Sequence, residues 1–243
     1  MRLSRVFVEA PLASGTAAIL SGSAANHVVR VLRLRKGHEL TLFNGSGGEY
    51  AARIESLTGS TVTVSIGEER AVERESPLVL TLAQGISRGE RMDLVMQKAT
   101  ELGVTHLVAV LTERSVVRLD AAQAQRKLAH WRAITIAACE QSGRNRPPGV
   151  VGPVGLRDLL RSDLKSGTRL LLSPEAKLRV VDVPRPVHSV TVLIGPEGGL
   201  TAEEHERAVG AGFLGVRLGP RVLRTETAAL AALALLQREF GDL

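Results

Sequence analysis

Two glycine-rich segments near the C-terminal end of the sequence carry the side chains best suited to chemistry. The first reads GPEGG and contains Glu197, and the second reads LRTET and contains Arg224 and Glu226. A carboxylate can accept a proton from a weak acid, whereas a guanidinium group keeps its charge and can stabilise negative charge that develops during a reaction. Glu197, Arg224 and Glu226 are therefore the candidate catalytic residues.

Both glutamates also have a structural explanation. Glu226 lies where a helix is expected to begin, and negative charge at that end of a helix is favourable without any catalysis. For Glu197, the alternative is that its carboxylate only braces the glycine loop around it. At the level of sequence, the choice of a general base between the two stays open.

The surrounding pattern predicts that each glycine segment closes a strand and opens a helix. Residues 190–194 form a β-branched run typical of a buried strand, and Thr201 with Glu204 has the spacing of a capping box. Residues 216–218 and the apolar run 228–236 frame the second segment in the same way. Glycine permits positive φ and a close approach of a ligand to the backbone. Two such loops at the carboxyl ends of strands are typical of the ligand site of an open α/β sheet.

Composition favours a folded protein with an anionic partner. Of the 243 residues, 44% are hydrophobic, and the formal net charge is +6. Aromatic residues amount to only 2%, which disfavours RNA readers that stack bases on an aromatic sheet. The glycine segments match neither the P-loop nor GxGxxG. A single cysteine and scattered histidines predict neither a disulfide nor a metal site. Without a signal-peptide core or an apolar run of membrane-spanning length, we expect no membrane partner and a cytoplasmic protein.

The distribution of secondary-structure signals predicts two domains. Short β-rich segments separated by glycine turns occur at residues 6–8, 39–43, 50–54 and 61–66. They indicate a small β-barrel at the N-terminus. The charged stretch EERAVERES marks the boundary. Beyond it, strands alternate with helices, which predicts a largely parallel α/β sheet.

Helical signals in the second domain come from capping and from apolar spacing. Ser87 and Glu90 have capping-box spacing ahead of a helix that reaches about Leu102. Apolar residues at helical spacing predict another helix over residues 121–141. The last predicted helix, residues 228–236, is apolar on every face, so we expect it to be buried in the core or in a subunit contact.

A basic run in the first domain is a candidate phosphate-binding surface. Arg30, Arg33 and Arg35 follow one another without an intervening acidic residue, while Val28 and Val31 have helical spacing. The alternative is an ordinary solvated helix face. Because the whole chain also carries excess positive charge, we favour contact between this run and nucleic-acid phosphates.

The glycine segments in full, LIGPEGGLTAEE and LGPRVLRTETAALAAL, resemble the cofactor motifs of the RsmE family. HVVRVLRLRKGHEL, QGISRGERMDLVMQKATELGV, ERSVV, ACEQSGRNRPP and, more weakly, LLLSPEA extend the resemblance over nearly the full length. RsmE proteins are SPOUT-superfamily methyltransferases that methylate N3 of a uridine in 16S ribosomal RNA. The resemblance implies a PUA-like RNA-binding β-barrel over residues 1–72, a SPOUT methyltransferase domain over residues 73–243, a homodimer and S-adenosyl-L-methionine as cofactor. It also implies a trefoil knot, which general rules of chain topology would not predict.

The resemblance further implies which residues bind the cofactor and the RNA. The expected cofactor site consists of Leu172, Ser173, Ile194, Gly195, Pro196, Glu197, Gly198, Gly199, Leu218, Gly219, Leu223, Arg224, Thr225, Thr227 and Ala228. The expected RNA contacts are Arg5, Arg30, Arg33, Arg35, Arg88, Arg114 and Arg144. No metal ligand is expected.

Three functions are compatible with these observations. The favoured one is S-adenosylmethionine-dependent methylation of uridine N3 in 16S rRNA of the small ribosomal subunit. The second is a SPOUT enzyme with another RNA target, for example one that methylates a ribose 2′-O of tRNA. The motifs GPEGG and LRTETA argue against this second function. The third is a non-catalytic RNA-binding protein of ribosome assembly. Binding of S-adenosylmethionine distinguishes the third from the others, and the identity of the methylated atom distinguishes the first two.

Overall fold

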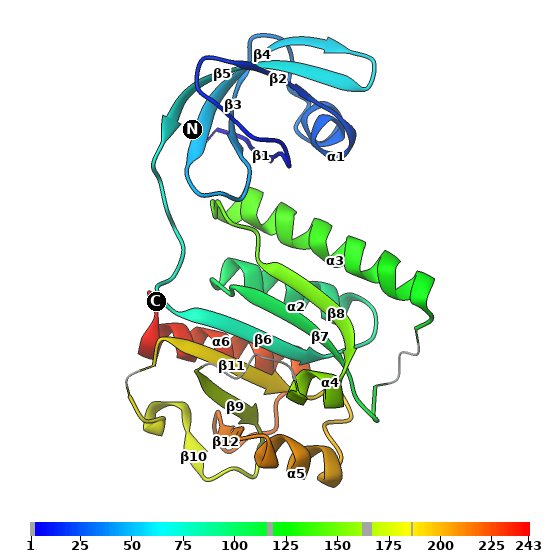
Figure 1. The fold of residues 1–243 in the computed structure, drawn as a ribbon, viewed down its shortest axis with the longest axis vertical. Coiled ribbons are helices and arrows are strands. Elements are labelled where there is room, and N and C mark those ends of the chain that lie inside the picture. Colours follow the sequence, from blue (N-terminus) through cyan, green and yellow to red (C-terminus); the bar gives the residue numbers. More distant parts are fainter. Residues whose placement is uncertain (1–2, 116–118, 162–166, 186) are drawn as a thin grey trace. The chain divides into compact units, whose positions relative to one another are not determined.

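The protein is described here by a computed structural model that covers residues 3–115, 119–161, 167–185 and 187–243. The chain divides into two compact units, whose elements are labelled in Figure 1. The first unit comprises Met1–Glu75 together with Ile136–Pro147. The second comprises Ser76–Thr135 and Pro148–Leu243. Each unit is therefore built from two separate stretches of sequence.

The described residues of the first unit form a five-stranded sheet in the order β1-β3-β4-β5-β2. β1 runs parallel to β3, whereas the other neighbours are antiparallel. Along β5, Val62, Val64 and Ile66 are buried and alternate with half-buried residues, as expected for a strand with one face on a core. The strands are β1 Arg5–Phe7, β2 Ala17–Leu20, β3 Glu39–Phe43, β4 Glu49–Thr58 and β5 Thr61–Arg70. The sequence did not predict β2, because AAIL contains one β-branched residue and offers little strand signal.

A short helical segment lies between β2 and β3. It consists of α1, Gly22–Asn26, and the π-helix η1, His27–Val31. Val28 is buried in the core of the first unit, whereas Arg30 is exposed. The helical segment ends before Arg33, which has a φ of 53° that is uncommon outside glycine. The basic run is therefore divided between a helix and the following loop.

A buried polar network ties the two stretches of the first unit together. Arg5 forms an ion pair with Glu49 and donates to the side-chain oxygen of Asn145. Arg74 donates to the same Glu49 carboxylate at 3.2 Å and to the carbonyl oxygen of Gly143 at 2.9 Å. Burial acts to raise the pKa of Glu49, but hydrogen bonds and positive charge from Arg5 and Arg74 outweigh it, so the pKa lies below its ordinary value.

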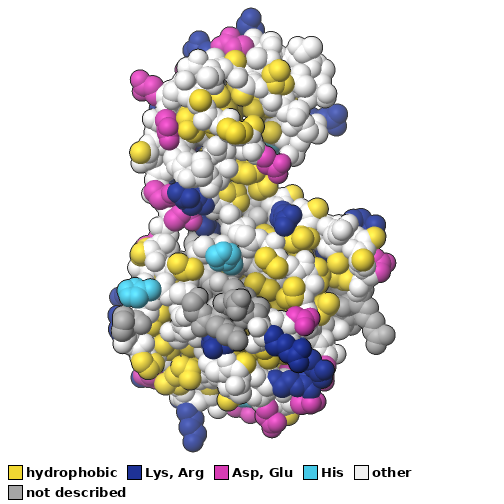
Figure 2. Space-filling model, in the orientation of Figure 1, with side chains coloured by type: hydrophobic (Ala, Val, Ile, Leu, Met, Phe, Trp, Pro, Cys, Tyr) yellow, Lys and Arg dark blue, Asp and Glu magenta, His cyan; other side chains and the backbone are white. Residues whose placement is uncertain are grey.

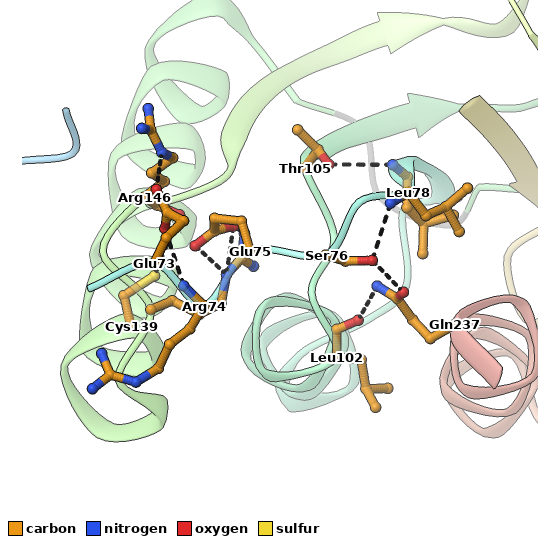
Figure 3. A network of polar contacts seen from close by, with 12 residues as sticks. Glu73, Arg74, Glu75, Ser76, Leu78, Leu102, Thr105, Cys139, Arg146 and Gln237 are labelled. Carbon is orange, nitrogen blue, oxygen red and sulfur yellow. Dashed lines mark hydrogen bonds and ion pairs between the residues drawn. The ribbon is translucent and has the colours of Figure 1, made fainter. Parts of the chain in front are cut away.

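Further pairs of the first unit surround this network, and Figure 3 shows several of them. Arg144 forms an ion pair with Glu75, and Arg146 donates to the carboxylate of Glu73 at 2.8 Å. The backbone N–H of Phe7 donates to the carboxylate of Glu140 at 3.0 Å. Residues far apart in sequence thus complete one folded unit.

The described residues of the second unit form a sheet of seven parallel strands in the order β10-β12-β9-β11-β6-β7-β8. The central strands β11 and β6 pair in register from Ser189 with Val79 to Ile194 with Gln84. The strands are β6 Val79–Gly85, β7 His106–Leu111, β8 Gly149–Gly155, β9 Thr168–Leu172, β10 Leu178–Arg179, β11 Ser189–Ile194 and β12 Leu214–Arg217. This parallel arrangement confirms the predicted α/β sheet.

Helices cover both faces of this sheet, because alternate residues of its strands point to opposite sides. On one face, Leu82 and Val192 belong to a core with Met96 of α2. On the other face, Ala83 and Leu193 pack in a core with residues of α4 and α5. The helices are α2 Glu90–Glu101, α3 Ala121–Ser142, α4 Leu156–Arg161, the 3-10 helix η2 Val180–Asp182, α5 Ala202–Gly210 and α6 Thr225–Phe240. Of these, α3 continues into the stretch that belongs to the first unit.

Two predictions about helix ends had different outcomes. Thr201 and Glu204 form the predicted capping box, with each side chain bonded to the other's backbone N–H. The prediction for Ser87 and Glu90 was wrong: α2 begins after Gly89, whose φ of 56° an L-residue rarely adopts. Gly89 occupies the N-cap position without a side-chain cap, and Ser87 lies too early in the chain to occupy it.

The C-terminal helix α6 is buried mainly along one side. Ala229, Leu233 and Leu236 belong to the core of the second unit, while Leu235 is 38% exposed. Figure 3 shows Gln237 near the end of this helix, where its side chain accepts from Ser76 and donates to the carbonyl oxygen of Leu102. Contacts within the second unit therefore account for part of the burial that was expected for α6.

Candidate functional site

A cavity of about 740 Å³ lies in the second unit at the carboxyl ends of neighbouring parallel strands. The end of β9 contributes Leu172 and Ser173, and the glycine segment 195–199 follows β11. The second glycine segment leads from β12 to the first turn of α6 and contributes Arg224 and Glu226. The two segments singled out in the sequence thus line one pocket, where open α/β sheets bind their ligands.

Glycines in the pocket wall permit unusually close backbone packing. A Cβ atom at Gly85, the last residue of β6, would lie 2.4 Å from the backbone nitrogen of Pro196. A Cβ at Gly195 would lie 2.9 Å from the carbonyl carbon of Gly199. The loop after β11 is therefore tightly folded and lies directly on the end of β6, and a side chain at either glycine would displace it.

A buried glutamine joins the three backbone segments that meet beneath the pocket. Gln84 is 1% exposed, and its side-chain amide donates to the Thr225 hydroxyl at 2.9 Å and to the Gly85 carbonyl at 3.0 Å. Thr225 in turn donates to the carbonyl oxygen of Gly195 at 2.6 Å. The start of α6, the glycine loop and the end of β6 are thus fixed relative to one another. Gln84 was not among the predicted site residues, although it is a polar side chain near the end of an apolar strand.

Glu197 is held by a donor from α2 and by the backbone N–H of Arg88, which lies shortly before that helix. Its Oε1 atom accepts from the backbone N–H of Arg88 at 3.1 Å and from the Arg91 guanidinium at 3.0 Å. Burial acts to raise the pKa of Glu197, but hydrogen bonds from backbone N–H groups and Arg91 outweigh it and keep the pKa below its ordinary value. These contacts connect the glycine segment 195–199 to Arg88 and Arg91, an arrangement compatible with the structural alternative. Arg91 was not predicted as a site residue, because it lies more than a hundred positions from Glu197.

Glu226 has a different environment from Glu197. Its Oε1 atom lies 3.8 Å from Nε of Arg91, an ion-pair distance that is too long for a hydrogen bond. Its Oε2 atom is buried, and neither oxygen has a hydrogen-bond partner among the described residues. The side chain of Glu226 is 14% exposed and lines the pocket. Arg91 thus faces both pocket carboxylates, but its hydrogen bond goes to Glu197.

Arg224 lies on the pocket wall with an exposed side chain. Its backbone begins α6, since its carbonyl oxygen accepts from the N–H of Ala228 at 2.8 Å. In the described part of the chain, the Arg224 guanidinium makes no hydrogen bond or ion pair. The guanidinium that holds Glu197 is that of Arg91, so Arg224 is available for a ligand.

The loop after β7 supports the glycine segment from its outer side. Arg114 donates to the carbonyl oxygen of Gly198 at 2.9 Å. The backbone N–H of Glu113 donates to the buried carboxylate of Glu204 at 2.8 Å, in addition to the capping box. These bonds place Arg114, expected to bind RNA, beside the glycine segment 195–199. Residues 116 and 117 of the same ERSVV segment lie outside the described residues.

The structure brings nearly the whole expected cofactor set to one cavity. The lining residues that belong to that set are Leu172, Ser173, Ile194, Gly195, Pro196, Glu197, Gly198, Gly199, Leu218, Gly219, Leu223, Arg224, Thr225 and Ala228. Thr227 is not among the lining residues and is exposed one position further along α6. Because successive helical residues point in different directions, the neighbours of Thr227 face the pocket while it does not.

The arginines expected to bind RNA fall into two groups. Arg30, Arg33, Arg35, Arg88 and Arg114 are exposed. Arg5 and Arg144 are 6% and 4% exposed, and carboxylates hold their guanidinium groups inside the first unit. These two guanidinium groups therefore have a structural role, which corrects the expectation that they bind RNA. The basic residues of a sequence do not reveal which of them are paired internally.

Surface charge does not outline an RNA path on the face drawn in Figure 2. On the face drawn in Figure 2, basic side chains lie singly or in small groups and are interspersed with acidic ones.

In the ranges that the structure describes, no group of three or more His, Cys, Asp or Glu side chains could hold a metal ion. Over the same ranges, no helix is long and apolar enough to cross a membrane.

Comparison with known proteins places this geometry in a family. Residues 74–237 match a family model described as an RNA methyltransferase domain, and residues 20–67 match an RNA methyltransferase PUA domain. Ribosomal RNA small subunit methyltransferase E of Buchnera aphidicola (subsp. Schizaphis graminum) is 33% identical over 100% of this chain and 98% of its own length. This chain belongs to the ribosomal RNA small subunit methyltransferase E family. The resemblance read from the glycine segments is thereby confirmed.

Solved structures extend the comparison to the fold of the family. Ribosomal RNA small subunit methyltransferase E of Neisseria gonorrhoeae, crystallised with S-adenosyl methionine, is 40% identical over 100% of both chains, with a TM-score of 0.91. A methyltransferase of Legionella pneumophila in complex with the same cofactor is 44% identical over 100% of both chains, with a TM-score of 0.96. The expected fold class is confirmed for the parallel α/β sheet and the N-terminal PUA domain. The trefoil knot stays a prediction.

Proposed function

We propose that this member of the methyltransferase E family transfers a methyl group from S-adenosylmethionine to N3 of a uridine in 16S rRNA of the small ribosomal subunit. The observation that carries the proposal is the shared pocket, in which two glycine segments at the carboxyl ends of parallel strands meet Arg224 and Glu226. Family membership supports rRNA as the substrate and S-adenosylmethionine as the methyl donor. The choice of N3 rests on the resemblance of the motifs.

The residues that line the cavity suit this cofactor. A volume of about 740 Å³ is in the range of small-molecule sites. Leu172, Ile194 and Leu223 offer apolar contacts to an adenine ring, and the folded glycine loop allows close approach to its backbone. Glu197 and Glu226 provide negative charge for a cationic ligand. When bound, the cofactor supplies an electrophilic methyl group on a sulfonium.

Methylation at N3 requires the protein to handle a weakly acidic N–H. The base must be oriented so that the N3 electron pair faces the methyl group, its proton must be accepted, and the negative charge spreading to the uracil carbonyls must be stabilised. Arg224 suits the last role, because its guanidinium is charged, exposed and not engaged elsewhere among the described residues. Glu197 suits positioning of the loop, because Arg88 and Arg91 already occupy one of its oxygens.

Further assignments belong to the same proposal. The PUA-like domain covers about residues 1–72 and binds rRNA, with Arg30, Arg33 and Arg35 at phosphates, and the methyltransferase domain covers residues 73–243. The protein works as a homodimer in the cytoplasm, where its rRNA substrate is located. The exposure of Leu235 on α6 is compatible with a subunit contact there.

A labelling experiment tests the proposal. The protein is incubated with labelled S-adenosylmethionine and either free 16S rRNA or small ribosomal subunits, and the RNA is digested to nucleosides. We expect label in 3-methyluridine. Label in a ribose-methylated nucleoside would instead identify a different reaction of the same cofactor, and binding of the cofactor without any label in RNA would contradict an enzymatic role on these substrates.

A further inference from the structure

Within this proposed function, the two pocket carboxylates differ in how much of their acceptor capacity is already used. Oε1 of Glu197 accepts from the Arg88 backbone and from Arg91, at 3.1 and 3.0 Å. Glu226 accepts no hydrogen bond from the described residues, and its nearest cationic atom is Nε of Arg91, 3.8 Å from Oε1. Hydrogen bonds to a carboxylate stabilise its charged form and make it a poorer base. Glu226 is therefore the pocket carboxylate whose two oxygens both lack a hydrogen-bond donor among the described residues.

The position of Glu226 close to Arg224 is a second difference from Glu197. It occupies the second position of α6, two residues after Arg224, and both residues line the same cavity. A proton acceptor and a charge stabiliser on one helix start can address the same uracil ring, since its N3–H lies between its two carbonyl groups. Of the Glu226 oxygens, Oε2 is buried and Oε1 faces Arg91, so Oε1 is the atom that a substrate can approach.

We infer that Glu226 is the general base that accepts the N3 proton of the target uridine, and that Arg91 is the residue that positions both carboxylates. The inference rests on the proposed function. Arg91 fixes Glu197 through a hydrogen bond and holds Glu226 only through charge, so Glu226 stays free to bind the substrate N–H.

The reaction balances without any further reactant. The N3–H proton moves to Oε1 of Glu226, and the electron pair of N3 forms the new bond to the methyl carbon. The bond from that carbon to sulfur breaks, and its electrons remain on the sulfur of the demethylated, neutral product. Glu226 then releases the proton to water and regains its charge, which makes it ready for the next substrate.

Charged groups around Glu226 define what a pH experiment will report. Arg91 faces Glu226 from α2. The ionisable residues lining the same cavity are Arg91, Glu175, Glu197, His205, Arg221, Arg224 and Glu226. The arginines keep their charge over the working range, so a matched change at Glu197 is needed to separate the base from the general electrostatics of the pocket.

The test compares Glu226→Gln with the matched variant Glu197→Gln in the full-length protein. Single-turnover rates of 3-methyluridine formation are measured from pH 6 to 10 at saturating RNA and S-adenosylmethionine, and the cofactor dissociation constant is measured at equilibrium. For Glu226→Gln, we expect a rate about 10²-fold lower or more at neutral pH, because a positioned base contributes about 10²–10⁴-fold. Its rate should rise with pH as N3 ionises without help, and its cofactor affinity should change less than about threefold. Glu197→Gln should weaken cofactor binding while keeping the wild-type shape of the pH profile.

A more acidic substrate provides a rescue specific to proton transfer. RNA transcribed with 5-fluorouridine has a more acidic N3–H, because fluorine withdraws electrons from the ring. The ratio of wild-type to Glu226→Gln rates should shrink on this RNA, whereas the ratio for Glu197→Gln should stay the same.

Two results would overturn the inference. The first is a Glu226→Gln enzyme with the wild-type rate and pH profile. The second is a loss of rate that saturating cofactor restores, because it would make Glu226 a cofactor ligand. Both are read against wild-type formation of 3-methyluridine on the same RNA. If wild type itself produces no 3-methyluridine, the proposed function fails, and that outcome is distinct from failure of the base assignment.

Discussion

At the scale of single residues, the structure separates side chains that sequence reasoning had to treat alike. Glu197 and Glu226 were equivalent candidates, yet Arg88 and Arg91 bind only the first by hydrogen bonds. Arg224 and Arg91 show the same division, because Arg91 braces the pocket and Arg224 stays exposed at its wall. A residue's role in this pocket thus depends on which partners the fold has already assigned to it.

Arg224 is expected to act on the transition state rather than on cofactor binding. Negative charge appears on uracil only as N3 loses its proton and gains the methyl group, so an arginine aimed at it lowers the barrier. Arg224→Ala should lower kcat by about 10²-fold, the scale seen when one preorganised donor is removed. Arg224→Lys should recover part of the rate, because a point charge replaces the planar fork.

Cofactor affinity decides whether this account of Arg224 holds. Equilibrium binding of S-adenosylmethionine should change little in the alanine variant, and saturating cofactor should not restore its rate. A variant whose rate returns to normal at high cofactor concentration would show instead that Arg224 is a cofactor ligand.

At the scale of elements, the pocket depends on bonds between segments distant in sequence. Gln84 is the second-last residue of β6, Gly195 follows β11 and Thr225 begins α6, and the side chain of Gln84 connects the three. Glycine at positions 85 and 195 allows the contact to be close. The site is therefore assembled by the sheet order, which brings β11 next to β6.

Replacing Gln84 with leucine should loosen the pocket without filling it. Leucine has a similar size but cannot donate to Thr225 or to the Gly85 carbonyl, and a buried group left unsatisfied costs about 1–3 kcal/mol. We expect weaker S-adenosylmethionine binding and a melting temperature lower by several degrees. Gln97→Leu on the exposed side of α2 is the matched control and should change neither quantity appreciably. Equal effects of the two substitutions would remove the special role of Gln84.

The ion pairs of the first unit predict a stability that depends on pH. Removing one partner of a buried pair costs about 3 kcal/mol or more, so Glu49→Gln should lower the unfolding free energy at neutral pH. The pKa of Glu49 is lowered in the folded state, so its contribution is complete above the ordinary value of 4.5 and is lost as pH falls through the lower folded-state value.

Thermal or denaturant unfolding at several pH values measures this contribution. The difference between wild type and Glu49→Gln should be largest at neutral pH and shrink in acid. Glu39→Gln is a suitable control, because Glu39 and its partner Arg53 are each 58% exposed in their side chains. A Glu49→Gln protein that matches wild type at neutral pH would show that the network contributes no net stability.

At the scale of the whole molecule, the exposed basic residues of the first unit are expected to set the strength of RNA binding. Each phosphate contact contributes about one unit to the slope of log affinity against log salt. Replacing Arg30, Arg33 and Arg35 with alanine should therefore reduce that slope by about two to three units and leave cofactor binding unchanged. A control with the same loss of charge replaces the exposed Arg157, Arg161 and Arg238. If both triple variants lose the same slope, net charge rather than this surface governs binding.

The sequence could predict those features of the fold that depend on a few neighbouring residues. The capping box of Thr201 and Glu204 needs only four residues, and the strand before Gly195 needs only an apolar run. The prediction from Ser87 was wrong because a serine three residues before a glutamate is a common spacing. The chain enters α2 through Gly89 instead, with a φ of 56°. Arg91, Gln84 and the burial of Arg5 depend on partners tens to more than a hundred positions away. Such pairings become visible only when the topology brings the segments together.

The divided sequence of the first unit has a consequence for how the protein is made. Arg5 and Arg74, which both pair with Glu49, also find partners at residues 143–145, so this unit lacks part of its interior until the chain has been synthesised to about residue 147. Domains generally fold as units during synthesis, and the N-terminal one usually folds first. Here the first stretch of the second unit, Ser76–Thr135, emerges from the ribosome before the N-terminal unit is complete. A transplant of the RNA-binding module to another protein would likewise need both stretches, with the end of α3 included.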